Sequence, residues 1–225
     1  MLAGVELGDA VRRRRMVRRY DPHRLVPPGM VRQLLEFAIR APSAGFSQGW
    51  DFVVLQDPDD RARFWTATTA PDIGADAAPD SDPHAEPDHW LRGMQSAPVL
   101  VLCLSDPGRY LDRYAEPDKG WADRSLTRWP VPYWDVDTGM AALLILLGSV
   151  DAGLGGCFFG VPADRHAEVR ETFGIPNDRR IVGVVSLGYP APGDGQRGSS
   201  SLRRGRRPVD EVAHQGRFGV RPSGT

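Results

Sequence analysis

Residues 137–156 read DTGMAALLILLGSVDAGLGG, and the stretch is nearly all apolar from Gly139 to Val150. It is too long for one strand, so it predicts a helix buried on every side, and the glycines after Asp151 predict where that helix stops. Such a helix of about 12 residues needs covering on all its faces. A chain of 225 residues with three clear strands has limited material for this, so the sequence favours a dimer that supplies the missing cover.

The segments around this helix predict alternating strands and helices. Three short apolar runs, rich in β-branched residues, predict strands at 51–56, 97–105 and 180–190. An amphipathic helix is expected from Pro28 to Arg40, and another is expected between Pro162 and Gly174. Together these elements predict a layered α+β fold in one domain over residues 1–225.

The bulk composition excludes some classes of partner. With 28 basic and 29 acidic side chains the net charge is -1, so neither nucleic acid nor an anionic membrane surface is expected as a partner. No apolar run approaches the roughly 20 residues of a membrane span, and the N-terminus does not resemble a secretion signal. We therefore expect a cytoplasmic protein. Cys103 and Cys157 lie in apolar runs and are expected to be buried thiols without a redox role.

Two arginine clusters stand near opposite ends of the chain. Lys119 is the only lysine, so arginine is common here and only clustering makes it informative. Residues 12–19 read RRRRMVRR and residues 201–212 read SLRRGRRPVDEV. Each cluster alone is consistent with a solvated basic face or tail. If the two converge, they form a positive pocket of phosphate size in which guanidinium groups bind oxygens in pairs.

Two loops rich in small residues are candidate ligand surfaces. Residues 42–50 read PSAGFSQGW; they either form a simple connection or present backbone amides, the Ser43 hydroxyl and the Gln48 amide to a flat ring. Residues 153–160 read GLGGCFFG; they either cap the preceding helix or let the backbone approach a ligand closely. The second loop is not a dinucleotide fingerprint, because it follows a helix rather than a strand.

In this order and at these distances, the four elements resemble the nitroreductase family of FMN enzymes. Family members typically carry RRSxR, then APSAGNxQPW, then GLGSCWIGG after a buried central helix, and finally a basic pair before proline. The resemblance spans nearly the whole chain, and APSAG-x-x-Q-x-W at 41–50 is its specific part. It implies a layered fold in which helices flank a central mixed sheet around a long buried helix. It also implies a homodimer with two flavin sites at the subunit interface.

The resemblance further implies an oxidoreductase that moves hydride from NAD(P)H through FMN to a small organic acceptor, such as a nitro compound or quinone, in a ping-pong cycle. The flavin supplies the chemistry, so no catalytic side chain and no metal site are expected. The implied cofactor-binding residues are Arg14, Arg15, Met16, Arg18, Arg204 and Arg206 for the phosphate and the pyrimidine edge, Pro42, Ser43, Ala44, Gly45 and Gln48 along the ring, and Phe159 with Gly160, whose N–H would donate to flavin N5.

Some residues depart from the family pattern. Met16 replaces a serine and leaves only backbone to act there, Phe46 replaces an asparagine, and Gly49 replaces a proline and is expected to loosen its loop. The acidic, proline-rich residues 66–92 predict a loop or lid, and residues 1–11 and 216–225 predict flexible or arm-like ends. The aromatic side chains between residues 121 and 134 either stack on a flat acceptor or pack between helices.

Three other functions are consistent with parts of the pattern. The site could hold a deazaflavin, which shares the tricyclic ring and the phosphate-bearing chain of FMN. The chain could also be a flavin-binding protein with a sequestering or sensing role rather than turnover. The third alternative is an α+β domain whose arginines contact RNA or DNA. The near-neutral charge and the lack of a recognised nucleic-acid module weigh against it.

Overall fold

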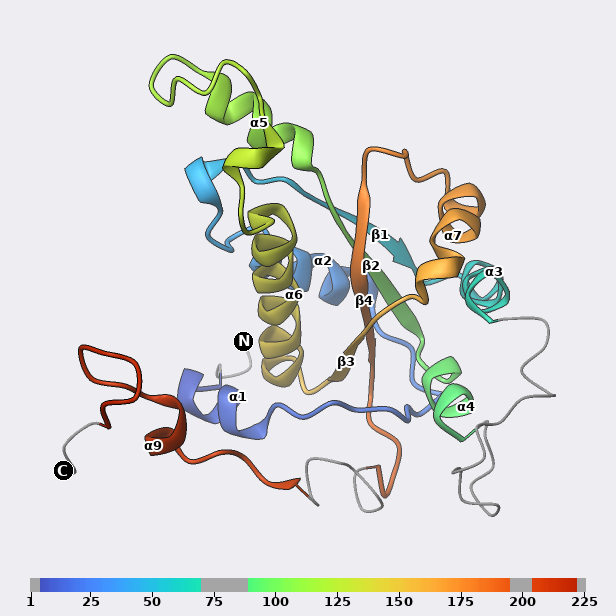
Figure 1. Ribbon diagram of the computed structural model, residues 1–225. Helices are drawn as coiled ribbons and strands as arrows, with labels where there is room; N and C mark the ends of the chain where they lie inside the picture. The colour runs from blue at the N-terminus through green and yellow to red at the C-terminus, as the bar shows by residue number, and fades with distance from the viewer. Residues whose placement is uncertain (1–4, 70–88, 195–203, 222–225) are drawn as a thin grey trace, which may run out of the picture. The chain divides into compact units, whose positions relative to one another are not determined.

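The computed structural model describes residues 5–69, 89–194 and 204–221 (Figure 1). The chain divides into two units, Met1–Pro192 and Gly193–Thr225. In the second unit the short helix α9 (Val209–Val212) follows an exposed basic segment, and Arg207 forms an ion pair with Glu211 at 3.2 Å. The single domain predicted over residues 1–225 stays a prediction. All elements described below belong to the first unit.

A four-stranded sheet forms the centre of the first unit. Its strands are β1 (Trp50–Leu55), β2 (Val99–Ser105), β3 (Gly155–Phe159) and β4 (Arg180–Gly188), in the order β1-β2-β4-β3. β2 is buried along its whole length, and the register places Val101 opposite both Val54 and Val185. The three predicted strand runs are therefore confirmed as β1, β2 and β4.

The described strands pair only in antiparallel fashion, so the expected mixed sheet is wrong for this part of the chain. The mixed sheet was expected from the family resemblance, and a mixed sheet contains some parallel pairs. However, helix α7 (His166–Phe173) lies beside helix α3 (Pro58–Thr68), away from the start of β3 (Figure 1). The chain therefore enters β4 from the end that β3 has just reached, and it runs back in the opposite direction.

Strand β3 was not predicted from the sequence, because glycine is rare in strands. Here the missing side chains make room for neighbours. A Cβ on Gly155 would lie 2.5 Å from Cγ2 of Val17, and a Cβ on Gly156 would lie 2.8 Å from Cδ2 of Leu146. The glycines therefore let β3 pass close to two other segments of the chain.

Helix α6 (Tyr133–Asp151) is the predicted central helix, and it packs against the sheet and helix α2 (Pro28–Ala38). It begins six residues before the predicted start at Gly139. Ile145 and its neighbours toward the sheet are buried, whereas Leu143 is 46% exposed. The expected burial on every side is therefore incomplete within one chain.

By length and composition alone α6 could cross a membrane, but half of the tested stretch is buried inside the protein.

The other face of the sheet is covered by α3, α4 (His89–Gln95) and α7. Phe64 of α3 and Val169 of α7 are fully buried in this second core. Part of the expected loop at 66–92 thus belongs to helices α3 and α4, and residues 70–88 lie outside the described residues.

Helices α1 (Leu7–Arg13) and α5 (Pro107–Ala115) complete the first unit. The sequence predicts neither α3 nor α5, since both begin with an Asp-Pro pair that also marks turns. In the structure each aspartate caps its helix: the Asp57 carboxylate accepts from the backbone N–H of Asp59 at 2.8 Å, and Asp106 accepts from that of Arg109 at 3.3 Å.

The expected flexible ends fall partly on α1 and partly on residues 1–4 and 222–225, which lie outside the described residues.

Both cysteines are buried free thiols, as expected. Burial raises the pKa of Cys103 to about 12, so this thiol stays protonated at neutral pH. Within the described residues Cys103 forms no disulfide, and it packs in the core as a small apolar side chain.

The contact between α6 and α2 predicts a stability difference between two glycine substitutions. A Cβ on Gly148 would lie 2.6 Å from Cδ2 of Phe37 and 2.9 Å from Cδ2 of Leu34. We expect Gly148→Ala to lower the free energy of unfolding by about 1–3 kcal/mol, because the helices must move apart. Gly29→Ala, on the exposed first turn of α2, meets nothing within 4 Å and should stabilise by up to about 1 kcal/mol. Urea unfolding of both variants checks this, and equal effects would contradict it.

Candidate functional site

The arginine segment leaves helix α1 and runs beside strand β3. Met16 forms a parallel bridge with Gly156, and the backbone N–H of Val17 donates to the Gly156 carbonyl at 3.0 Å. The Val17 side chain is buried over Gly155, whereas Arg15 and Arg18 are exposed. The Met16 sulfur accepts the backbone N–H of Phe158 at 3.5 Å, so its side chain is used inside the fold. The structure thus brings the first predicted cluster next to the glycine-rich turn.

Arg14 carries a buried donor without an acceptor. It caps the C-terminus of α1, and its Nη1 atom is buried with no hydrogen-bond partner within the described ranges. An unpaired buried N–H loses its hydration and costs about 1–3 kcal/mol. A guanidinium in this state is well suited to bind an anion, because a phosphate oxygen would satisfy the donor and the charge together.

A pocket lies between this segment and the end of helix α6. Its volume is about 330 Å³. It is lined by Arg13, Arg15, Val17, Ser149, Val150, Gly153, Leu154, Gly155, Gly156 and Pro190. Two arginines therefore share a pocket with the glycine-rich turn, in which Gly153 is exposed, and this is a suitable setting for a phosphate-bearing ligand.

Strand β3 ends in an aromatic cluster next to an exposed glycine. The Phe159 ring stacks on Trp65 at 5.8 Å between centroids with an interplanar angle of 8°, and Trp90 meets its edge at 6.0 Å. Gly160 follows directly, is exposed, and has open space where a Cβ would stand. Its backbone is thus accessible, as a role at the edge of a ligand ring requires.

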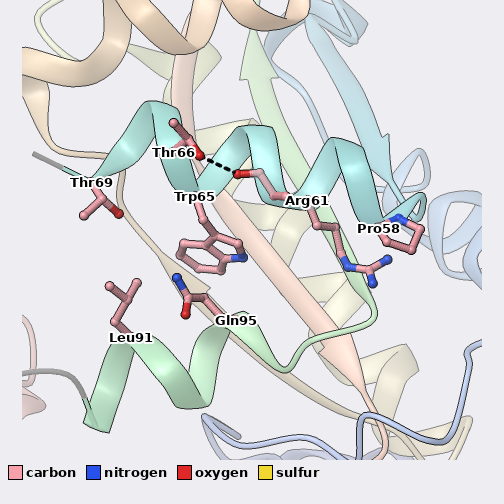
Figure 2. A pocket seen from close by; sticks show the side chains of 8 residues that line it. Pro58, Arg61, Trp65, Thr66, Thr69, Leu91 and Gln95 are labelled. Atoms are coloured by element: carbon pink, nitrogen blue, oxygen red, sulfur yellow. Dashed lines mark hydrogen bonds between the residues drawn. The ribbon is translucent and has the colours of Figure 1, made fainter. Parts of the chain in front are cut away.

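A second cavity, of about 520 Å³, is lined by Trp65 of this cluster, and Figure 2 shows the side chains around it. Trp65 and Arg61 reach it from α3, while Leu91 and Gln95 reach it from α4. Burial lowers the pKa of Arg61, which nevertheless donates to the backbone carbonyls of Gln56 and Pro98. This arginine is therefore a structural tie between elements.

The loop at 42–48 is a strained turn. Gly45, Phe46 and Gln48 have φ values of 62°, 57° and 50°, in the left-handed region that side chains rarely adopt. The Ser43 hydroxyl accepts the backbone N–H of Gln48 at 3.0 Å, and the Ser47 hydroxyl donates to the Ala44 carbonyl at 2.7 Å. The side chains of Phe46 and Gln48 are exposed, so the loop presents them outward.

Helix α5 packs against the glycines of this loop. A Cβ on Gly49 would lie 2.4 Å from Cε2 of Tyr110, and a Cβ on Gly45 would lie 2.7 Å from Cε2 of Tyr114. Arg113 donates from Nε to the Gly45 carbonyl at 3.0 Å. The sequence led us to expect that Gly49 loosens the loop, and the structure shows that it does not. It admits a tyrosine ring that fixes the loop.

A buried carboxylate joins the loop to α5. Oδ2 of Asp137 accepts the backbone N–H of Ala44 at 2.9 Å and the Tyr110 hydroxyl at 2.8 Å. Burial, and then the hydrogen bond to Asp137, raise the pKa of Tyr110 well above its usual range, so its hydroxyl remains a donor. The sequence analysis missed Asp137 and Tyr110. The available signal was an acidic residue at the start of an otherwise apolar helix.

The two groups of predicted site residues lie at opposite ends of α6 within one chain (Figure 1). The 42–48 loop contacts Asp137 near the start of the helix, whereas the pocket with Arg15 includes Val150 near its end. Thirteen residues of helix separate these contacts, which is about 20 Å. Arg204 and Arg206 are exposed in the second unit, so their convergence with the first cluster stays a prediction.

The aromatic side chains between residues 121 and 134 pack on one another and on α5. Trp129 lies 4.7 Å from Tyr114 and 5.5 Å from Trp121, measured between ring centroids. Trp134 meets the buried Tyr110 at 6.1 Å. This packing accounts for their presence, and a further contact with an acceptor stays a hypothesis. Within the described part of the chain no group of His, Cys, Asp or Glu could hold a metal ion.

Comparison with known proteins matches most of the chain. A model described as the Nitroreductase family matches residues 11–189. The chain is 32% identical over 227 residues to a 4-nitrobenzoate reductase of Nocardioides sp. (strain LMS-CY), covering 93% of this chain and 90% of the relative. It is 30% identical over 203 residues to an NADH dehydrogenase of Thermus thermophilus, covering 81% and 85%.

Solved structures share the fold. A nitroreductase family protein from Streptococcus pneumoniae TIGR4 superposes with a TM-score of 0.68 at 20% identity, over 93% of this chain and 100% of that one. A protein from Desulfovibrio desulfuricans, solved in complex with FMN, gives 0.65 at 20% identity, over 96% and 99%. This likeness confirms the layered α+β fold with a long buried helix.

The unpaired donor of Arg14 predicts an unusual stability effect. We expect Arg14→Met to raise the free energy of unfolding of the ligand-free protein by about 1 kcal/mol, because it removes a buried N–H that has no acceptor. Arg12→Met is the matched control: Arg12 is exposed and pairs with the exposed Asp9 at 2.7 Å, so it should change stability by less than about 0.5 kcal/mol. Urea unfolding measures both. A clear loss of stability in Arg14→Met would mean that this guanidinium is already satisfied.

Proposed function

The chain belongs to the nitroreductase family of oxidoreductases, and from this premise we propose that it binds FMN and transfers hydride from NAD(P)H to a small organic acceptor. The observation that carries the proposal is the buried Nη1 of Arg14, which has no hydrogen-bond partner within the described residues and lies two residues before the bridge from Met16 to Gly156 of the glycine-rich turn. An arginine in that state needs an anion, and FMN carries one as its phosphate. The family match over residues 11–189 and the Desulfovibrio desulfuricans structure solved with FMN support the same cofactor.

The residues present fit the phosphate end of FMN. Arg14, Arg15 and Arg18 would hold the phosphate, and Arg15 shares a pocket with the exposed Gly153 of the glycine-rich turn. The Met16 side chain is engaged with Phe158, so its backbone would be the part that contacts the ligand. Arg204 and Arg206 would join this group from the second unit.

Other residues fit the ring. The accessible backbone N–H of Gly160 would bond flavin N5, with Phe159 held beside it by Trp65. Pro42, Ser43, Ala44, Gly45 and Gln48 would lie along the isoalloxazine, where the exposed Gln48 amide offers both a donor and an acceptor. Bound FMN would supply the transfer of hydride from NAD(P)H to the acceptor, in a ping-pong cycle. The protein binds and orients the reactants.

We propose a homodimer because one chain separates the two groups of residues. About 20 Å of helix α6 lies between the 42–48 loop and the arginine pocket, so a composite site would combine the loop of one subunit with the arginines of the other. Tyr133, Val136 and Leu143 form an apolar stripe on α6, each more than 40% exposed. A second copy packed on this stripe would complete the burial of the helix.

The acceptor is proposed from the relatives. The relative at 32% identity is named a 4-nitrobenzoate reductase, and we propose a nitroaromatic compound or a quinone as the acceptor here. The aromatic side chains near Trp129 would face such a flat molecule. Deazaflavin has the same phosphate-bearing chain and ring shape, and the arginines would hold it equally well.

The proposed function predicts a bound flavin that turns over. We expect purified protein to show the absorbance of oxidised flavin, to release a compound with the mass of FMN in acid, and to lose the flavin absorbance when NADH or NADPH is added without oxygen. Addition of 4-nitrobenzoate or menadione should then restore it. A released deazaflavin would replace the cofactor in the proposal. Bound FMN that neither nicotinamide reduces would favour a sequestering or sensing role.

The proposed dimer predicts the effect of a charge in the apolar stripe. Leu143→Arg places a charge in the apolar stripe, and because Leu143 is exposed in the single chain the fold itself should tolerate it. We expect light scattering to show a dimer for the wild type and a monomer for the variant, with loss of bound FMN. Leu25→Arg, at a residue that is 76% exposed outside α6, is the control and should stay dimeric. A dimeric Leu143→Arg variant with full FMN content would contradict the composite site.

A further inference from the structure

We propose that Asp137 is the positioning residue for the 42–48 loop, so that it fixes the loop against which the cofactor ring rests without touching the cofactor. The inference rests on the proposed function for the cofactor, but its structural part concerns the ligand-free chain. It assigns a role to a buried acidic residue in α6 that the phosphate and ring contacts above leave unused.

The burial of Asp137 makes its hydrogen bonds obligatory. The residue is 1% exposed, and no ion pair with it occurs within the described part of the chain. A buried carboxylate is tolerated only when hydrogen bonds replace its lost water. One oxygen accepts the Ala44 N–H at 2.9 Å and the Tyr110 hydroxyl at 2.8 Å. The carboxylate thus ties three segments together: the loop, α5 and α6.

The loop needs an external anchor. Gly45, Phe46 and Gln48 all have positive φ values, and such backbone persists only when the surroundings hold it. The bonds inside the loop, from Ser47 to Ala44 and from Gln48 to Ser43, fix its local turn. They do not fix the turn to the rest of the protein.

The anchors of the loop come from helices α5 and α6. Tyr110 lies over Gly49, Arg113 donates to the Gly45 carbonyl, and Asp137 accepts the Ala44 N–H. Phe46, which is 75% exposed, stays on the open side together with Gln48. A planar ligand on the open side therefore meets a loop whose shape is set before binding, and preorganisation of this kind strengthens binding.

The role of Asp137 is to accept hydrogen bonds, and this can be separated from its charge. Asp137→Ala removes the acceptor and the charge, whereas Asp137→Asn removes the charge but keeps an oxygen that can accept from Ala44. Asp135→Ala is the matched control on the same helix: Asp135 accepts from Ser105 at 2.6 Å and pairs with Arg180 at 3.0 Å, and no bond from it to the loop is described. Tyr110→Phe keeps the ring over Gly49 but removes the second donor to Asp137.

Two measurements test the proposal. Amide hydrogen exchange of the ligand-free proteins, followed by NMR, should show Ala44 exchanging at least about ten-fold faster in Asp137→Ala, with the amides of β2 unchanged. FMN titration by fluorescence quenching should show a Kd about ten-fold to about a hundred-fold weaker. Asp137→Asn should lie near the wild type in both, Tyr110→Phe should shift both in the direction of Asp137→Ala but by less, and Asp135→Ala should change neither.

The outcomes separate this proposal from the proposed function. If Asp137→Asn behaves like Asp137→Ala, the charge acts rather than the anchor, and the proposal is overturned. It is also overturned if Ala44 exchange and FMN affinity are unchanged in Asp137→Ala or, where that variant does not fold, in Tyr110→Phe. If the wild type does not bind FMN, the proposed function fails, while the exchange rates still decide whether Asp137 anchors the loop.

Discussion

The close packing of helix α6 against the sheet and α2 is the constraint on which the rest of the first unit depends. At Gly148 there is no room for even one methyl group between α6 and the side chains of α2, and Gly156 gives Leu146 the same close approach on the strand side. Because the helix is fixed in this way, its two ends are fixed as well. The first turns hold the 42–48 loop, and the last turn helps to form the arginine pocket.

Each end of α6 handles polar groups in a different manner. At the start, Asp137 is fully engaged by Ala44 and Tyr110, so the polar group is satisfied inside the chain. Near the end, Arg14 keeps a buried donor that the described part of the chain does not satisfy. The hydrogen bonds of Asp137 make the protein more rigid, whereas the Arg14 donor is left for a ligand to bind. A family that leaves chemistry to a cofactor needs both a rigid support and an anion site.

Local patterns predicted much of the fold and part of the site. The strands β1, β2 and β4 and the helix α6 follow from continuous apolar runs, and the helices α2 and α7 follow from amphipathic patterns, because burial acts directly on the sequence. Strand β3 was not predicted, because its glycines are required by contacts with distant residues. Gly155 leaves room for Val17, and Gly156 leaves room for Leu146. The motifs located the arginine segment and the loop. They could not reveal Asp137, because its partner Ala44 is 93 residues away in sequence.

The position of Lys119 has a practical consequence. It is the only lysine in the chain, and its ammonium lies 5.3 Å from the centre of the Tyr114 ring, which in turn packs on Gly45 of the 42–48 loop. Reagents selective for amines therefore reach one side chain and the chain's own terminus. A dye or crosslinker attached at Lys119 would sit on the segment that supports the loop, where it can report movement of that loop without any engineered attachment point.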